Sequence, residues 1–146
     1  MNQGPAPLAV FDEATERLGL ATSIRRDEPL GPLTTYRVGG PAARMAVVSN
    51  DAQLAAVAQA VSESGLDVLV VGKGSNLLVA DSGFAGLAVQ LAGDFADVEI
   101  TPGDDGLTAV VRAGGAALLP VVARRTVAAG LTGFEWAVGV PGSIGG

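Results

Sequence analysis

A short glycine-rich segment at residues 72–76, Gly-Lys-Gly-Ser-Asn, carries the clearest chemical potential in the sequence. Gly72 and Gly74 allow a ligand to approach the main chain closely, and successive N–H groups in such a loop can converge on an anion. The serine and the asparagine add side-chain donors. The segment therefore predicts a phosphate-binding loop. An ordinary tight turn is the alternative, because Gly, Ser and Asn also cluster in turns.

Two familiar phosphate loops do not fit this segment. A Rossmann fingerprint needs a further glycine and then a helix, but Leu77 occupies that position and residues 77–79 favour a strand. A P-loop needs Gly-Lys-Ser/Thr after an earlier glycine, but Gly65 is too distant and Gly74 follows Lys73. Lys73 is the only lysine of the chain, and its ammonium group could contact phosphate directly, although binding by backbone groups is the other option.

The residues before the loop predict a strand–helix–strand unit. Residues 43–48 and 68–71 predict strands, and the second is expected to be buried because it is a short Val/Leu run. Between them, Asn50 begins a helix with Gln53 in a capping-box position, and Gly65 ends it. Such a unit is parallel and right-handed, and it places a ligand loop at the carboxyl end of a strand. The apolar face of the helix is expected to comprise Leu54, Val57, Ala58 and Val61.

Further upstream, the pattern predicts an amphipathic helix within residues 8–20, after a disordered start at residues 1–7. Residues 27–40 are rich in Pro and Gly and predict a turn-rich segment, in which residues 34–37 alternate and could pair as a short strand. The ring of Tyr36 is expected to pack, with its hydroxyl satisfied locally.

The second half of the sequence predicts a hairpin and a helix. Residues 87–91 favour a strand, and residues 95–101 and 107–113 favour a hairpin around a Pro-Gly-Asp-Asp-Gly turn. A helix is expected at residues 117–129, and Gly130 should end it. Asp104 and Asp105 are interpreted as solvated turn formers rather than as a metal or acid–base pair. Phe134 and Trp136 are expected in the core, ahead of a second glycine-rich loop at residues 139–146.

Composition excludes several classes of function. The sequence has no Cys and no His, so thiol nucleophiles, disulfides, Cys/His zinc sites and His-based triads are ruled out. The net charge is −6 and no basic stripe is present, which argues against nucleic-acid binding. No secretion signal or membrane-length apolar run is apparent, so we expect a soluble cytoplasmic protein. The low charged fraction of 16% and the unclosed C-terminal sequence lead us to expect further chain in the parent protein.

Four segments, in order, resemble the family of UDP-N-acetylenolpyruvoylglucosamine reductases. Gly-Lys-Gly-Ser-Asn-Leu-Leu-Val, at residues 72–79, is similar to the first flavin-binding segment of that family. Residues 32–40 resemble its opening Thr-Thr/aromatic/Gly-Gly segment, residues 130–137 its Gly-Leu-x-Gly-hydrophobic-Glu stretch, and residues 138–146 its second flavin loop. The resemblance covers residues 28–146.

This resemblance implies an α+β fold with an α/β-like βαβ start, of the PCMH-type, vanillyl-alcohol-oxidase-like flavin-binding kind, truncated, with two small mixed α/β subdomains. We expect an N-terminal extension with a short helix at residues 1–28, a first FAD-binding subdomain at 29–93, and the start of a second at 94–146. The substrate-binding domain would be absent. The implied FAD contacts are Gly72, Lys73, Gly74, Ser75, Asn76, Leu77, Val140, Pro141, Gly142, Ser143, Ile144, Gly145 and Gly146.

The implied activity is the NADPH-dependent reduction of UDP-N-acetylglucosamine enolpyruvate to UDP-N-acetylmuramate in peptidoglycan precursor synthesis. The family's catalytic Arg, Ser and Glu belong to segments expected beyond Gly146, so no catalytic residue is assigned and this chain alone is expected to lack turnover. The expected partner is a small UDP-sugar, contacted by those later segments, and neither nucleic acid, membrane nor a metal is expected. Another PCMH-type flavin oxidase or dehydrogenase, or a non-catalytic binding module, is the alternative.

Overall fold

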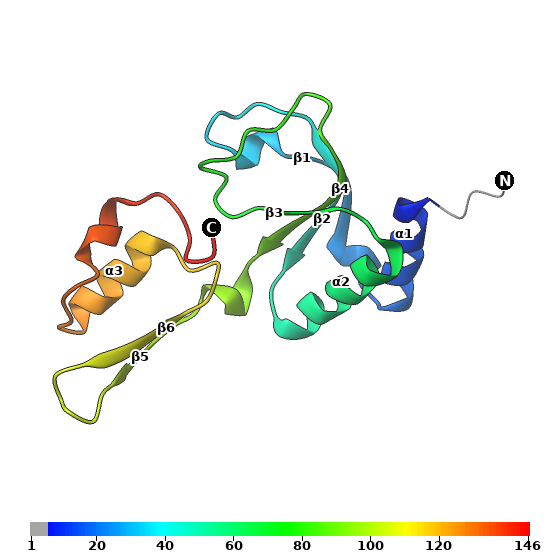
Figure 1. Ribbon diagram of the computed structural model, residues 1–146. Coiled ribbons are helices and arrows are strands. Elements are labelled where there is room, and N and C mark those ends of the chain that lie inside the picture. The colour runs from blue at the N-terminus through cyan, green and yellow to red at the C-terminus, as the bar shows by residue number, and fades with distance from the viewer. Residues whose placement is uncertain (1–5) are drawn as a thin grey trace.

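A four-stranded sheet with the order β1-β2-β4-β3 forms one of two lobes in the computed structural model, which describes residues 6–146 (Figure 1). β2 (Pro41–Val48) runs antiparallel to β1 (Ile24–Pro29) and parallel to β4 (Phe84–Leu91). β3 (Val68–Val70) is also parallel to β4. β2 and β3 are therefore not neighbours, because β4 lies between them in the sheet. The carboxyl ends of these three parallel strands lie at the same edge of the sheet.

The crossover helix α2 (Asp51–Ser64) has the predicted caps. The Asn50 side chain accepts a hydrogen bond from the Gln53 N–H at 3.0 Å, and the Gln53 side chain accepts one from the Ser49 N–H at 2.8 Å. Gly65 ends the helix with a left-handed backbone, at φ 65°. The capping box and its glycine stop are thus confirmed.

The two faces of the sheet are covered differently. Helices α1 (Pro7–Arg17) and α2 cover one face. The core on this side comprises Phe11, Ala14, Leu20, Ala46, Val48, Val57, Ala60, Leu66, Leu87 and Val89. Irregular segments cover the opposite face, where the core comprises Leu30, Ala42, Met45, Val71, Val79 and Ala88. Loops, and not a second helical layer, therefore occupy the face that leads to the glycine-rich segment.

The predicted apolar face of α2 is only partly correct. Val57 is buried and Val61 is half-buried, but Leu54 and Ala58 are exposed, and Ala60 is buried instead. Contact with both the sheet and α1 rotates the buried stripe toward Ala60.

The second lobe contains the predicted hairpin and helix. β5 (Val98–Pro102) pairs antiparallel with β6 (Ala109–Ala113), and the Asp105 carboxylate accepts hydrogen bonds from the N–H groups of Leu107 and Thr108, both at 2.9 Å. Asp105 is therefore a turn former, as expected. α3 (Leu119–Ala128) follows, with Pro120 in its first turn, and packs with Val98, Ala117 and Phe134 through Val122.

Two predicted strands are wrong. Residues 34–37 form a bend because the Thr34 hydroxyl donates to the Gly31 carbonyl at 2.9 Å and accepts from the Arg37 N–H at 3.0 Å. These local bonds occupy groups that a ladder would need, and residues 24–29 pair with β2 instead. Residues 77–79 are also irregular, because they cross the loop-covered face of the sheet with Val79 buried.

Other predicted burials fail because of position in the fold. β3 lies at the sheet edge, so Val68 and Val70 are 43% and 64% exposed instead of buried. Trp136 is 65% exposed and touches Phe134 edge to face, so only Phe134 joins the core. The Tyr36 side chain is also exposed. The expected disorder at residues 1–7 falls largely outside the described residues, but Pro7 begins α1.

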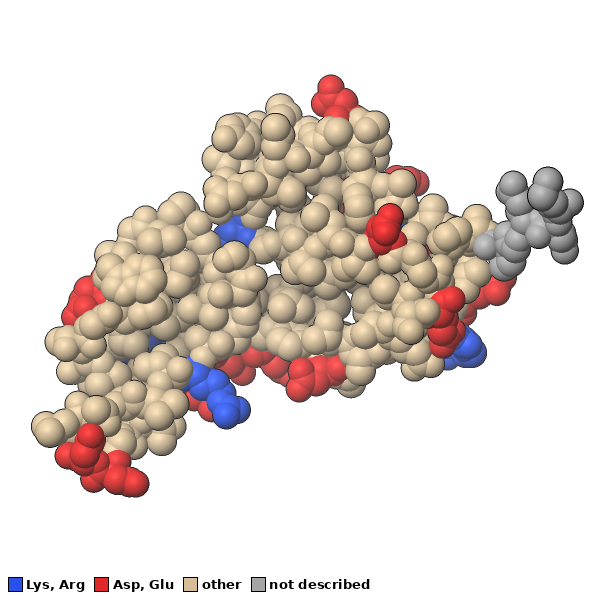
Figure 2. All heavy atoms as spheres, in the orientation of Figure 1, with Lys and Arg blue, Asp and Glu red and all other residues tan. Residues whose placement is uncertain are grey.

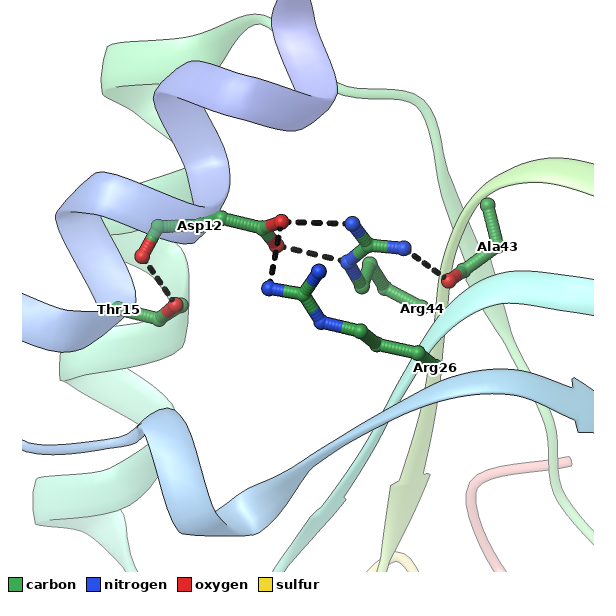
Figure 3. Close-up of polar contacts among 5 residues, drawn as sticks. All are labelled: Asp12, Thr15, Arg26, Ala43 and Arg44. Carbon is green, nitrogen blue, oxygen red and sulfur yellow. Dashed lines mark hydrogen bonds and ion pairs between the residues drawn. The ribbon is translucent and has the colours of Figure 1, made fainter.

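A polar cluster fixes α1 to the sheet (Figure 3). The Asp12 carboxylate accepts two hydrogen bonds from the Arg44 guanidinium, at 2.7 Å from Nε and 2.6 Å from Nη2, and pairs with Arg26 at 2.9 Å. Arg44 also donates to the Ala43 carbonyl at 2.6 Å. The hydrogen bonds from Arg44 lower the pKa of Asp12, and the same bonds raise the pKa of Arg44.

Among residues 6–146, no helix is long and apolar enough to cross a bilayer.

We expect Asp12→Asn to lower the free energy of unfolding by about 1–3 kcal/mol at pH 7, since it breaks a bidentate pair whose Asp12 side chain is only 18% exposed. Urea denaturation measures the change. Glu13→Gln, on an exposed position of the same helix, is the matched control and should leave stability unchanged.

The pH dependence of this stabilisation follows from the direction of the pKa shift. A lowered folded pKa stabilises the protein above the unfolded value, near 3.8, and this contribution disappears as the pH falls through the folded pKa. The difference in stability between the parent chain and Asp12→Asn should therefore be constant above about pH 5 and shrink below about pH 4. A difference that stays constant to pH 2 would contradict this assignment.

Candidate anion and cofactor site

The first glycine-rich loop begins where the parallel ladder ends. The Val71 N–H donates to the Val89 carbonyl at 2.8 Å, which continues the β3–β4 pairing by one residue. The N–H groups of residues 72–76 then make no hydrogen bond to any residue in the described part of the chain. A run of unpaired main-chain donors is costly unless water or a ligand satisfies them. The loop therefore presents an anion-binding surface at the carboxyl edge of the sheet.

Close packing against residues 31–35 fixes the shape of this loop. The Gly74 carbonyl accepts hydrogen bonds from the N–H groups of Thr35 and Leu77, both at 3.3 Å. Gly74 has φ +65°, and a β-carbon at this position would lie 2.0 Å from the Leu33 carbonyl oxygen. Only glycine fits here, and its role is to seat the loop on its neighbour.

The second glycine-rich loop is ordered by main-chain bonds to residues 115–119. The Leu119 N–H donates to the Gly142 carbonyl at 3.1 Å, and the Gly145 N–H donates to the Gly115 carbonyl at 2.9 Å. Ser143 is 5% exposed, and its hydroxyl makes no hydrogen bond within residues 6–146. Because every fully buried polar side-chain atom among the described residues has a partner, this unpaired hydroxyl oxygen is open to solvent and available to a ligand.

The two loops, distant in sequence, meet between the lobes. A β-carbon built on Gly72 would lie 3.4 Å from the Ser143 hydroxyl oxygen and 3.7 Å from the α-carbon of Gly146. The C-terminal end accordingly lies beside the segment that follows β3 (Figure 1). Gly72 and the Ser143 hydroxyl thus bring the two loops together at one point.

Two adjoining hollows occupy this region. The first, of about 70 Å³, lies between the loops and is lined by Gly72, Lys73, Ser143 and Gly145 together with Gln90 and Gly115. The second, of about 420 Å³, is lined by Gly72, Lys73 and Gln90 and by residues from Pro32 to Arg37. Pockets for drug-sized ligands span roughly 300–1,000 Å³. The smaller hollow therefore suits one small group, and the larger one suits a greater part of a nucleotide.

The remaining predicted contacts are not all brought to these hollows. Ile144 lines a separate cavity of about 580 Å³ between the β5–β6 hairpin and α3. The residues that line neither hollow between the loops are Gly74, Ser75, Asn76, Leu77, Val140, Pro141, Gly142, Ile144 and Gly146. Among these residues, Gly74, Ser75, Asn76 and Gly142 keep an unpaired main-chain N–H that could reach a ligand.

Sequence reasoning missed Gln90, Gly115 and Ala116, which line the smaller hollow. Gln90 had a detectable signal: it is the one polar side chain in the β4 run Phe-Ala-Gly-Leu-Ala-Val-Gln-Leu and stands near its carboxyl end. Gly115 stands just before the predicted helix at residues 117–129, and its carbonyl accepts a hydrogen bond from the second loop.

Perturbed titratable groups do not surround the hollows. Backbone N–H donors lower the pKa of Asp105 and of Glu135, and both carboxylates are exposed in the second lobe. Acidic side chains lie mostly along the edges of the face in Figure 2, and uncharged residues dominate its centre. The arrangement is therefore suited to binding an anion by neutral donors, and no acid–base pair is evident among the described residues.

Comparisons with known proteins agree with this geometry. Residues 42–146 match the FAD binding domain family. The chain is 42% identical over 138 residues to the UDP-N-acetylenolpyruvoylglucosamine reductase of Acidiphilium cryptum, covering 94% of this chain and 40% of the relative. It is 44% identical over 124 residues to the reductase of Streptomyces avermitilis, covering 82% of this chain and 30% of the relative.

A solved structure agrees as well. The chain superimposes on the crystal structure of UDP-N-acetylenolpyruvylglucosamine reductase from Thermus caldophilus with a TM-score of 0.66 and 32% identity, covering 84% of this chain and 41% of that one. The expected α+β flavin-binding fold is thereby confirmed. The chain spans between 30% and 41% of the length of these relatives. Because the family model matches residues 42–146, most of the sequence, the chain belongs to the FAD binding domain family.

Proposed function

We propose that the two glycine-rich loops hold the pyrophosphate of FAD. The observation that carries this proposal is the run of unpaired N–H groups at residues 72–76, which begins at Gly72 beside the unpaired hydroxyl of Ser143. Pyrophosphate oxygens accept hydrogen bonds from such donors without needing a cation. The donor set in this structure therefore fits the diphosphate bridge of a dinucleotide.

The contacts that we propose have different roles. Gly72 and Gly145 allow close approach of the main chain, Ser143 supplies a hydroxyl, and Lys73 supplies a charge at the polar hollow. Gly74 seats the loop, and the unpaired N–H groups of Ser75, Asn76, Gly142 and Ser143 contribute main-chain donors. FAD, when bound, supplies hydride-transfer chemistry, and the protein supplies binding and orientation.

We further propose that a whole protein containing this chain is a UDP-N-acetylenolpyruvoylglucosamine reductase. Its relatives carry that name, and the chain matches 40% of the length of one of them. On this proposal NADPH reduces the enolpyruvyl group of a UDP-sugar in the cytoplasm. Residues 29–93 and 94–146 would form the two FAD-binding subdomains, and the substrate and NADPH contacts would come from residues outside this chain.

The first expected outcome is flavin binding by the purified chain. Addition of FAD should give a saturable change in the visible absorbance and fluorescence of the flavin, because both loops and their donors are present. Equilibrium dialysis checks the stoichiometry. A chain that is folded by circular dichroism yet leaves the flavin spectrum unchanged would contradict the proposed half of the site.

The second expected outcome distinguishes the role of Gly72 in FAD binding from the role of Gly74 in stability. Gly72→Ala should keep the fold, because its β-carbon meets only ordinary contacts, but should weaken FAD binding by about tenfold, because the methyl group enters the space between the loops. Gly74→Ala should instead lower the free energy of unfolding by about 1–3 kcal/mol through backbone strain.

Gly106→Ala, in the turn of the β5–β6 hairpin, is the matched control, because Gly106 shares the φ of +65° with Gly74 and a β-carbon there meets nothing within 4 Å. It should lower stability less than Gly74→Ala does and leave affinity unchanged. Thermal unfolding and flavin fluorescence titration provide the two measurements. Equal effects of Gly72→Ala and Gly106→Ala on affinity would remove Gly72 from the proposed site.

The third expected outcome concerns turnover. The chain alone should not oxidise NADPH in the presence of FAD and the enolpyruvyl UDP-sugar, because no carboxylate of the described residues lines the hollows and the NADPH and substrate contacts are proposed to lie outside this chain. Absorbance at the NADPH band follows the reaction. Substrate-dependent oxidation by this chain would show that the catalytic groups lie within it.

A further inference from the structure

We propose that Gln90 is a positioning residue for the first glycine-rich loop: its side-chain amide holds the Gly72 carbonyl and thereby keeps the Lys73 N–H available to the bound anion. The proposal rests on the proposed binding of FAD and adds a residue that the sequence motifs do not contain. The supporting observation is a hydrogen bond of 3.3 Å from Gln90 Nε2 to the Gly72 oxygen.

The position of Gln90 on β4 makes this contact possible. Successive side chains of a strand alternate between faces, so Gln90 shares a face with the buried Ala88. That face is the one covered by loops, and Val89 is the last β4 residue to pair with the chain before Gly72. A polar side chain at the carboxyl end of the central strand therefore meets the loop at its first peptide.

The geometry of a trans peptide gives the contact its consequence. The carbonyl and the N–H of one peptide point in opposite directions, and the described residues contain no cis bond. The carbonyl oxygen of the Gly72–Lys73 peptide accepts the hydrogen bond from the Gln90 side chain. The N–H of the same peptide, which belongs to Lys73, therefore points away from the Gln90 side-chain amide. A reversed peptide would turn an oxygen lone pair toward the anion and remove one donor.

Because Gly72 is a glycine, the Gly72–Lys73 peptide can reverse easily. A hydrogen bond such as that from Gln90 is therefore needed to hold it in one orientation. Gly72 lacks a β-carbon, so its backbone has more accessible conformations than any other residue would have. Gln90 lines both hollows together with Gly72 and Lys73, so no other wall residue is better placed to select one orientation. The amide also fits the task chemically, because a donor is required and a carboxylate would repel both the carbonyl and the ligand.

The test compares Gln90→Met with the parent chain in FAD titrations followed by flavin fluorescence. Methionine keeps the length of the side chain but cannot donate, so FAD affinity should fall about fivefold, the value of one ordinary hydrogen bond. Gln90→Glu should weaken binding further, because it adds a negative charge beside the anion. Gln59→Met, which removes a glutamine bonded to Glu63 on the exposed side of α2, is the control and should bind FAD as the parent does.

A merely structural role for Gln90 predicts a different result. It would lower the melting temperature and leave the amide resonances of the loop in place. Our proposal predicts an unchanged melting temperature and shifted Gly72, Lys73 and Gly74 amide signals in the ligand-free Gln90→Met chain. If that variant does not fold, Gln90→Asn, whose amide is one methylene too short to reach, takes its place.

The outcomes also separate this inference from the proposed function. Parent-like FAD affinity in Gln90→Met would overturn the positioning role while leaving FAD binding intact. Failure of the parent chain to bind FAD would overturn the proposed half-site. The loop amide signals would then decide the role of Gln90, since unshifted signals would overturn it too.

Discussion

The main-chain donors of residues 72–76 must stay unpaired in a folded protein, and the rest of the site depends on that constraint. Main-chain groups near a sheet edge ordinarily find partners in the ladder or in a helix. Here the ladder stops after Val71, and the loop is held instead through its carbonyl oxygens: Gly72 by Gln90 and Gly74 by Thr35 and Leu77. Fixing the acceptors in this way leaves the donors free for an external anion.

The asymmetry of the sheet makes this arrangement possible. Helices α1 and α2 bury one face, and the cluster of Asp12, Arg26 and Arg44 anchors α1 there, so that side supplies most of the apolar core (Figure 3). On the opposite face, loops at residues 29–40 and 71–83 cover the smaller apolar core. A second helical layer would have occupied the space in which the two glycine-rich loops meet.

Local signals predicted local structure well. The Asn50–Gln53 cap, the glycine stop at Gly65 and the turn around Asp105 depend on neighbouring residues, and each appears as expected. Long-range pairing was harder to predict. Residues 84–91 insert between strands that precede them, which leaves β3 at the edge and exposes its valines, and nothing in the sequence of β3 indicates this order. The loop motifs were identified, but their contact and the part played by Gln90 arise from the fold.

The charge of the chain explains why neutral donors suit this site. The net charge is −6, and Arg17, Arg25, Arg26 and Arg44 are committed to carboxylates in ion pairs. Arg37 and Lys73 line the polar hollow together with Gly72, so positive charge lies beside the start of the loop that carries the unpaired N–H groups. An acidic surface disfavours non-specific contact with polyanions, whereas fixed dipoles and nearby cations attract one anion at one place. Selectivity of this kind therefore arises from backbone geometry more than from overall charge.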